Sequence, residues 1–244
     1  MDARAVAVLV AEGDARVIPT PASNPDEHGV VSTWKLKLED DGSATINASE
    51  LHVGDSAFFL RTHLGQADAR AQWVEANLLA RSLPNAKLEP EVGFDGALPG
   101  GAAKVDYRAS SRTLARHEGA ELVLAIAPGT PLATELAPLA RRTLPVQLPP
   151  QLAPSHHDVT IEVALPDGFR LAALPPNDEL AAGNLGTARQ SFTLSRDGKK
   201  LVIARSLRFD ASRIEVVDYA KWRAWLRDVD RMLHRSVRLV PKKK

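Results

Sequence analysis

Apolar and polar residues alternate with a period of two along much of this chain, and no other feature constrains the fold as strongly. The pattern is clearest in residues 34–49, where two alternating runs flank the turn Asp40-Asp41-Gly42-Ser43. Successive side chains of a β-strand point to opposite faces, so this segment predicts a hairpin with one apolar and one wet face. Its apolar positions are Trp34, Leu36, Leu38, Ala44, Ile46 and Ala48.

Strand patterns recur through the rest of the chain, and helical spacing is confined to a few short segments. Further strands are predicted at residues 6–10, 87–94, 103–110, 121–127, 159–163, 192–194 and 201–207. Short helices are predicted at 55–64 and from Asp68 to Leu83. A last helix is expected to begin after Asp218, because its apolar residues recur three and four positions apart. They are Trp222, Trp225, Leu226, Val229, Met232 and Leu233.

A proline-dense stretch divides the chain in two. Pro145, Pro149, Pro150 and Pro154 fall close together, and proline cannot donate to a strand ladder. We therefore expect a lead-in strand and linker at 1–27, a β-hairpin/helix/β unit at 28–127, a proline-rich connection at 128–154 and a second unit at 155–244. The expected fold class is mainly β with a few helices (α+β). It comprises two β-sandwich-like units, the second closed by the C-terminal amphipathic helix.

The composition indicates a globular protein without a strong electrostatic field. Apolar residues make up 44% of the 244 residues, which is enough for a core. Lys and Arg number 31 against 30 acidic residues, so no net charge favours binding to nucleic acid. No stretch approaches the roughly 20 apolar residues of a membrane span, so we expect no membrane insertion. Met1 is followed by Asp2-Ala3-Arg4, which predicts no signal peptide in this sequence.

The chain contains no cysteine. This excludes disulfides, thiolate zinc sites and catalysis by a cysteine thiolate. Its absence does not determine the compartment. We expect no catalytic residues, no cofactor and no metal site, and therefore no enzymatic activity of this chain alone.

Two kinds of acidic or histidine-containing cluster could suggest metal ligands. His156-His157-Asp158 lies in a predicted strand, where adjacent side chains point to opposite faces and cannot easily chelate one ion. Asp40-Asp41-Gly42 and Asp95-Gly96 lack the repeated acidic positions of a calcium loop, so we interpret them as turns.

Two further motifs could suggest catalysis or phosphate binding. Ser110-Ser111 precedes His117 and Glu118, but no GxSxG elbow is present. If a serine acted as a nucleophile, Ser110 and Ser111 with His117 would be the first candidates. Gly183-Asn184-Leu185-Gly186 lacks the strand–glycine–helix context of a phosphate loop and is interpreted as a turn.

Several structural motifs together resemble the C-terminal β-rich region of large bacterial transglutaminase-like proteins. These motifs are Arg141-Arg142-Thr143-Leu144-Pro145, the segment from Val163 to Arg170, Leu174-Pro175-Pro176-Asn177, Ser212-Arg213-Ile214 and the segment from Asp218 to Leu226. The segment from Ile18 to Asn24 is similar to the chain just after the papain-like core. In such proteins a β-rich domain of unknown function usually comes first and the papain-like core second. None of the matching motifs is catalytic.

The resemblance implies a non-catalytic accessory module that packs against a transglutaminase-like core, fused or separate. Its parent proteins are usually exported, which suggests a periplasmic or secreted location, although the chain itself does not fix one. The spacing of Tyr219, Trp222 and Trp225 predicts core residues, with docking of a partner domain as the other interpretation. The alternative function is a cell-envelope protein that binds a peptide or glycan between the two units.

Overall fold

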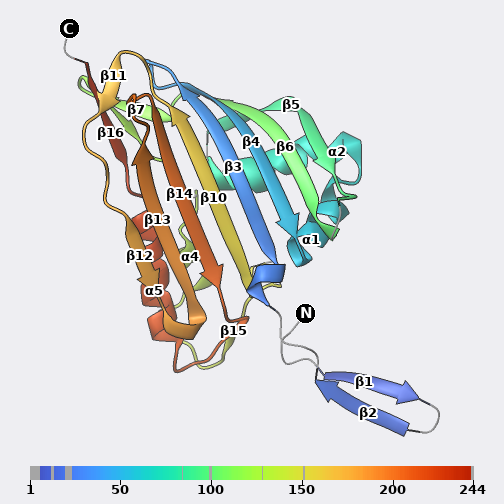
Figure 1. Cartoon of the computed structure of the whole chain (residues 1–244). Helices are drawn as coiled ribbons and strands as arrows, with labels where there is room; N and C mark the ends of the chain where they lie inside the picture. The colour runs from blue at the N-terminus through green and yellow to red at the C-terminus, as the bar shows by residue number, and fades with distance from the viewer. Residues whose placement is uncertain are drawn as a thin grey trace.

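The computed structural model describes residues 6–11, 14–19, 24–83, 85–98, 101–127, 129–150 and 152–242. Its main feature is an eight-stranded sheet with strand order β12-β13-β14-β10-β3-β4-β6-β5 (Figure 1). The pair β3–β10 is parallel, whereas the other neighbours are antiparallel. The strands are β3(Gly29–Leu38), β4(Ala44–Val53), β5(Ala86–Asp95), β6(Ala103–Ser111), β10(Ser155–Ala164), β12(Asp178–Ala181), β13(Gly186–Leu194) and β14(Lys200–Phe209).

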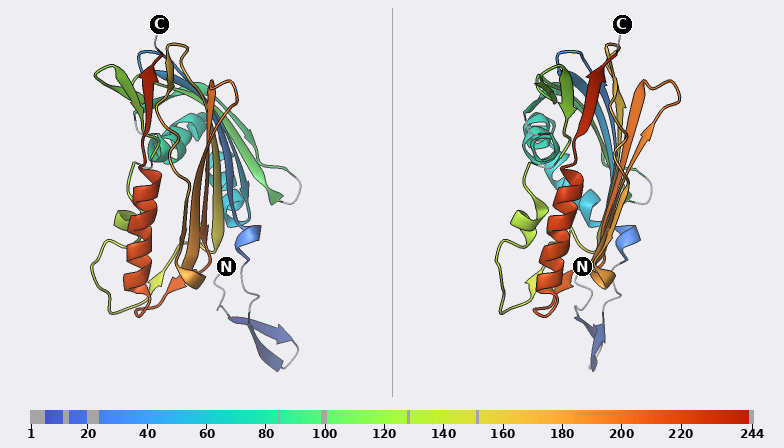
Figure 2. Two further views of the ribbon diagram at one scale, coloured as in Figure 1. Left: turned by 60° about the vertical axis from the view of Figure 1, so that its left-hand side comes forward. Right: turned by 90° about the vertical axis from the view of Figure 1, so that its left-hand side faces the viewer.

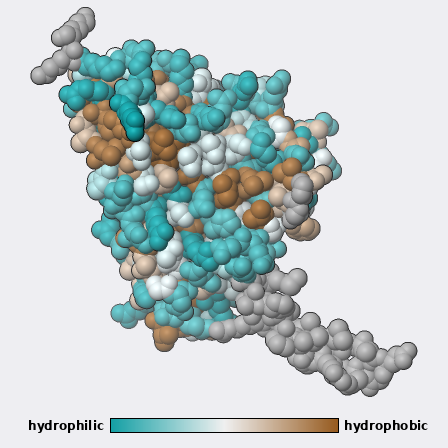
Figure 3. Space-filling view, in the orientation of Figure 1, coloured by the Kyte–Doolittle hydropathy of each residue, from teal (hydrophilic) through white to brown (hydrophobic). Residues whose placement is uncertain are grey.

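One face of this sheet is buried and the other faces solvent, as the alternating sequence predicts. Buried and more exposed residues alternate along β3, β4 and β6. The predicted hairpin is confirmed, with Trp34 opposite Ala48 and Leu36 opposite Ile46. The uncovered face is mostly hydrophilic, with scattered apolar groups (Figure 3).

The β3–β4 turn requires glycine at position 42. Gly42 has a φ of 83°, and a Cβ there would lie 2.1 Å from the carbonyl oxygen of Ala115. The amide of Ala115 also donates to the Gly42 carbonyl oxygen at 3.0 Å. The turn therefore joins the large sheet to strand β7(Ala115–Glu118).

The helices cover one face of the large sheet (Figure 2). A first group follows β4 and consists of α1(Asp55–Leu64), α2(Ala67–Val74), the π-helical segment η2(Glu75–Leu79) and the short α3(Ala80–Ser82). Among the helices of the described residues, none is both long enough and apolar enough to cross a lipid bilayer.

The long helix α5(Tyr219–Leu233) covers the other end of the same face, beside α4(Leu132–Leu136). Trp222 and Val229 are fully buried and Trp225 is 5% exposed, in a cluster with Phe209 of β14. The carboxylate of Asp230 accepts hydrogen bonds from the amides of Leu132 at 2.7 Å and Ala133 at 3.0 Å, so α5 caps the start of α4. The expected amphipathic C-terminal helix is thus confirmed.

A four-stranded sheet, ordered β11-β16-β8-β7, packs over the remaining part of the covered face. Its other strands are β8(Glu121–Leu124), β11(Phe169–Leu171) and β16(Val237–Pro241). The remaining elements are the hairpin β1(Val6–Ala11) and β2(Asp14–Pro19), the pair β9(Val146–Gln147) and β15(Arg213–Ile214), and the 3-10 turns η1(Pro25–Glu27) and η4(Gly183–Leu185).

The fold is mainly β with a few helices, as expected, but strands from both halves of the chain share one sheet. Strand β3 of the first half pairs with β10 of the second, from Gly29 opposite His156 to Lys37 opposite Ala164. One apolar cluster also combines residues of both halves, including Trp34, Ile161 and Leu201. The two halves that we expected to form two sandwich-like units thus contribute strands to one mixed sheet. Within the expected lead-in of 1–27, residues 1–5, 12–13 and 20–23 lie outside the described residues.

Candidate functional site

A cavity of about 380 Å³ lies between the covered face of the large sheet and the helices α1, α2 and η2. Strands β3, β4, β10 and β14 supply its floor, and the end of α5 contributes Leu233. Phe59 is 38% exposed and, like the exposed Arg81, lies at the rim. The volume of the cavity falls at the lower end of the range that is typical for small-molecule sites.

The floor of the cavity is polar because the covered face of the sheet changes character along its strands. On β4, buried Ala44, Ile46 and Ala48 are followed at the same phase by buried Glu50 and His52. His157 on β10 and Arg205 on β14 likewise point to the same face as the aliphatic residues further along those strands. Polar groups on a covered face need partners, since burial without a hydrogen bond is costly.

A hydrogen-bonded network links two strands, β4 and β6, and helix α1 at this floor. Tyr107 Oη donates to Glu50 Oε1 at 2.6 Å, and His52 Nδ1 lies 2.6 Å from Ser56 Oγ. His52 Nε2 is 3.5 Å from Glu50 Oε2. Burial, followed by the charge of Glu50, raises the pKa of Tyr107 far above its ordinary value. Tyr107 therefore remains a donor to the buried carboxylate.

Ser56 reaches this network because the chain turns sharply from β4 into α1. Gly54 occupies the junction with a φ of 61°, which favours glycine. The sequence analysis did not identify Glu50, His52 and Ser56 as a group. A signal was present, because positions 50 and 52 lie on the same face of β4 as its buried apolar residues, and Ser56 begins a helix just after Gly54.

The network contains a serine, a histidine and an acid, but it differs from an activated nucleophile. In hydrolase triads the acid orients the histidine through a short hydrogen bond. Here the Glu50–His52 contact is 3.5 Å and His52 Nε2 forms no hydrogen bond, while Tyr107 binds the other carboxylate oxygen. Ser56 is also only 8% exposed. The arrangement therefore suits a structural polar network better than acyl transfer.

Two further basic side chains line the cavity. Burial is the main cause that lowers the pKa of His157 to about 4, so its ring is neutral at pH 7. Burial also lowers the pKa of Arg205 to about 10, which leaves its guanidinium charged. At pH 7 the cavity is therefore lined by a neutral histidine, His157, and a cationic arginine, Arg205.

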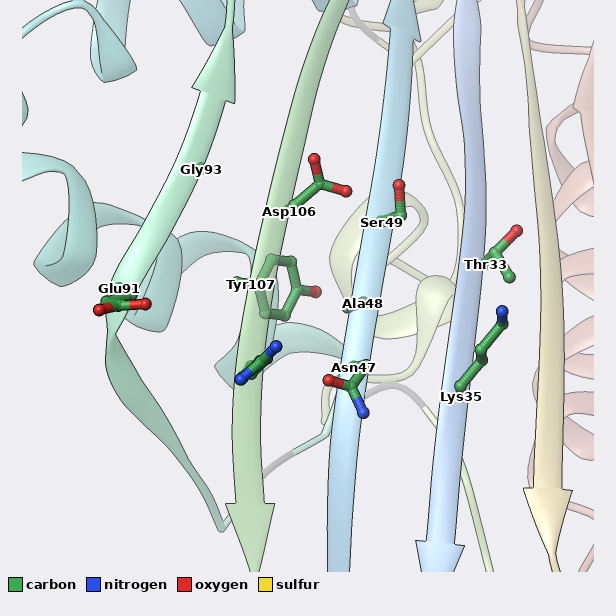
Figure 4. A pocket seen from close by; sticks show the side chains of 10 residues that line it. Thr33, Lys35, Asn47, Ala48, Ser49, Glu91, Gly93, Asp106 and Tyr107 are labelled. Carbon is green, nitrogen blue, oxygen red and sulfur yellow. The ribbon is translucent and has the colours of Figure 1, made fainter.

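A second depression, of about 430 Å³, lies on the solvent-facing side of the sheet. Figure 4 shows Thr33, Lys35, Asn47, Ser49 and Asp106 projecting from adjacent strands. These residues are the polar half of the strand alternation, and the depression is open to solvent. The cavity beneath the sheet is the better candidate because it is less open to solvent and is lined by buried polar side chains as well as apolar ones.

The histidines and turn residues singled out from the sequence are found in separate places. His156 and His157 point to opposite faces, since His156 Nδ1 lies 2.9 Å from the Pro25 carbonyl oxygen while His157 lines the cavity. Asp41 accepts a 2.9 Å hydrogen bond from the amide of Ser43, and Asp95 accepts one of 3.0 Å from Ala97, as turns require. The segment Gly183–Leu185 is the turn η4. Across the described ranges, no group of three or more metal-ligating side chains is found.

The serine and aromatic candidates are also placed by the structure. Ser110 and His117 are exposed, Ser111 is buried, and within the described residues no hydrogen bond joins either serine to His117. Tyr219, Trp222 and Trp225 are all buried in the cluster between α5 and the sheet. In the folded chain a partner could reach only the outer face of α5.

A comparison with family models matches just under half of the chain to a domain of unknown function. Residues 122–239 match the family model described as "Domain of Unknown Function with solved-structure structure (DUF3858)". The matched region runs from within β8 to within β16 and includes α5. No curated protein matches the chain.

Among solved structures, the chain is similar to a crystal structure of a "putative protease" from Parabacteroides distasonis. The two share 8% sequence identity and a TM-score of 0.35, over 88% of this chain and 100% of that chain.

Proposed function

We propose that this chain is a non-catalytic binding module whose cavity beneath the sheet receives a small ligand with an apolar body. The observation that carries this proposal is a partly open cavity of about 380 Å³ that combines apolar walls with buried polar side chains on its floor. Trp34 Nε1 and His52 Nε2 are both buried without a hydrogen bond. The indole nitrogens of Trp222 and Trp225 are likewise unsatisfied in the packed cluster under α5, so these atoms alone do not indicate a ligand.

The walls of the cavity fit the apolar part of such a ligand. Trp34, Trp73, Leu78 and Phe59 come from the sheet and from the helices opposite it. Phe59 also contacts Trp73 through their rings, with centroids 5.9 Å apart. Aromatic walls with a few polar groups are typical of small-molecule sites.

Two features support the proposal that the chain is non-catalytic: the absence of cysteine from the sequence and the geometry around Ser56. Cysteine is absent from the sequence, so thiol-dependent transamidation or proteolysis by this chain has no nucleophile. Ser56 adjoins a histidine, but the acid contact that would orient that histidine is long. Incubation of the pure protein with a glutamine donor and an amine acceptor is expected to give no turnover above background.

Binding can be tested with N-phenyl-1-naphthylamine, a neutral apolar dye whose fluorescence rises in apolar sites. We expect saturable binding to the full chain and loss of about tenfold or more in Ser32→Phe, because Ser32 is buried at the cavity floor. Ser49→Phe is the matched control, since Ser49 lies on the opposite face. Absence of saturable binding, or equal binding by a folded Ser32→Phe variant, would contradict the proposal.

A second proposed function is the accessory role, in which the module packs against a transglutaminase-like core in the cell envelope. The resemblance noted in the sequence supports it, as do exposed apolar side chains such as Phe58 at 70% and Val217 at 88% exposure. Titration calorimetry with a transglutaminase-like core domain from the same organism tests it. Phe58→Asp and Val217→Asp are expected to weaken an association. If the pure domains do not associate, this role is excluded for that partner.

A further inference from the structure

Arg205 is a cation on the covered face of the sheet, and the part of the chain that the structure describes offers it no anionic partner. Its Nε donates to Gln190 Oε1 at 2.7 Å. Its Nη2 donates to the carbonyl oxygens of Ile126 at 2.6 Å and Leu233 at 3.1 Å. All three acceptors are neutral. Among the described residues, no carboxylate lies within ion-pair distance of the guanidinium, and buried charges are normally paired.

The contacts of Arg205 leave part of its hydrogen-bonding capacity unused. Guanidinium offers five N–H donors in a planar fork, and its Nη1 has no hydrogen bond to a described residue. The carbonyl of Leu233 ends helix α5, so Arg205 also caps a helix C-terminus. Capping explains why Arg205 is tolerated here, but it engages only one of the two terminal nitrogens.

The indole nitrogen of Trp34 also lacks an acceptor, but protein atoms cover it, so a ligand in the cavity does not reach it. The anionic side chain at the cavity floor, Glu50, already accepts from Tyr107 and faces His52. The cavity therefore has its spare donor on Arg205 Nη1. A carboxylate supplies acceptor oxygens and no donor, so one of its oxygens can accept a charge-assisted hydrogen bond from Nη1.

We infer that the ligand of this cavity is an apolar carboxylic acid whose carboxylate is held by Arg205. This inference rests on the proposed binding function. The apolar body lies against Phe59, Trp73 and Leu78, towards the rim where Phe59 is partly exposed. Mostly apolar walls disfavour larger, strongly hydrated anions.

The test compares a matched acid and alcohol, 4-phenylbutanoic acid and 4-phenylbutan-1-ol, by titration calorimetry with the full chain at pH 7. We expect the acid to bind about tenfold or more tightly than the alcohol, because only the acid forms a charge-assisted contact. Arg205→Met should abolish this preference and leave the alcohol's affinity within about threefold. Arg205→Lys should retain part of the preference, since it keeps the charge but loses the planar fork.

A measurement on the unaltered protein tests the inference even if the Arg205→Met variant does not fold. The carbon-13 shift of a labelled carboxyl group gives the pKa of the bound acid, which Arg205 should lower relative to the free acid. Equal affinities for acid and alcohol, or an unshifted or raised pKa of the bound acid, overturn the inference and leave the binding proposal intact. If the naphthylamine dye also fails to bind, the binding proposal itself fails.

Discussion

The phenol of Tyr107 donates a 2.6 Å hydrogen bond to the buried carboxylate of Glu50, across two neighbouring strands of the large sheet. Glu50 is 5% exposed and Tyr107 is 3% exposed. A carboxylate buried this deeply depends on its donors, because it has little access to water. The pair therefore anchors the polar floor of the cavity to the apolar core beside it.

Replacement of Tyr107 by phenylalanine should destabilise the protein by about 1.5–3 kcal/mol, as expected for loss of a hydrogen bond to a charged group. Tyr219→Phe is the matched control, because Tyr219 donates to the Leu139 carbonyl oxygen at 2.8 Å and Leu139 is exposed to water. That loss should be about 0.5–1.5 kcal/mol. Urea unfolding measures both. Equal losses of stability in the two variants would show that the hydrogen bond to Glu50 stabilises the protein no more than the hydrogen bond to the Leu139 carbonyl oxygen does.

Folding stability should decrease as the pH falls from about 6.5 towards about 4, owing to His157. The pKa of His157 is lowered from 6.5 to about 4, mainly by burial and then by His156 and His52, while Asp158 and Glu50 oppose the shift. Between these values the unfolded chain binds a proton that the folded chain excludes, so stability falls as pH falls. The full effect is roughly 3 kcal/mol.

Urea unfolding across this pH range, with His157→Gln beside the unaltered protein, isolates the contribution of this histidine. The variant should lose less stability on acidification, whatever its stability at pH 7. His117→Gln is the control, since His117 is exposed. Parallel pH profiles for the unaltered and His157→Gln proteins would contradict the prediction.

Truncation of Trp225 to alanine should cost about 3–5 kcal/mol, as for other large buried aromatic residues. Trp225 packs against Phe209 at a ring-centroid distance of 5.9 Å and against Trp222 at 5.0 Å. Arg227→Ala on the exposed side of α5 should change the stability by less than about 0.5 kcal/mol. Thermal and urea unfolding provide the comparison. Similar, small losses in both variants would mean that α5 is loosely packed.

Ser56 should not react with a fluorophosphonate probe, which labels activated serine nucleophiles. The reason is its low exposure and the long contact between Glu50 and His52. Intact-mass spectrometry after incubation measures labelling, and chymotrypsin serves as a positive control. An adduct mapped to Ser56 would show that the network activates this serine and would replace the non-catalytic proposal by a hydrolytic one.

Local periodicity was sufficient to predict several elements of the fold. The hairpin around Gly42 and the amphipathic helix α5 follow from the spacing of apolar residues within a short segment. The pairing of β3 with β10 could not be predicted in this way, because periodicity specifies which face of a strand is buried and not which strand lies beside it. The shared sheet is a property of long-range contacts.

The candidate site was harder to predict than the fold. His156-His157-Asp158 drew attention as adjacent residues, yet only His157 of the two histidines faces the cavity. Glu50 and Arg205 resemble ordinary solvated charges when each is considered alone. Their place in the cavity becomes apparent only from the face of the strand on which they lie, because each continues a series of aliphatic residues on the covered face. The neighbours that complete the cavity come from distant segments.

The parallel junction between β3 and β10 also governs how the chain reaches its native state. During synthesis β3 and β4 are complete well before β10 emerges, so one side of β3 remains an open edge with unpaired amides and carbonyls. Open edges promote pairing between chains, and contacts between distant segments form slowly. A chain cut at the proline-dense stretch would retain this exposed edge in both pieces. Aggregation of the separated halves, relieved by mixing them, is the behaviour that this junction implies.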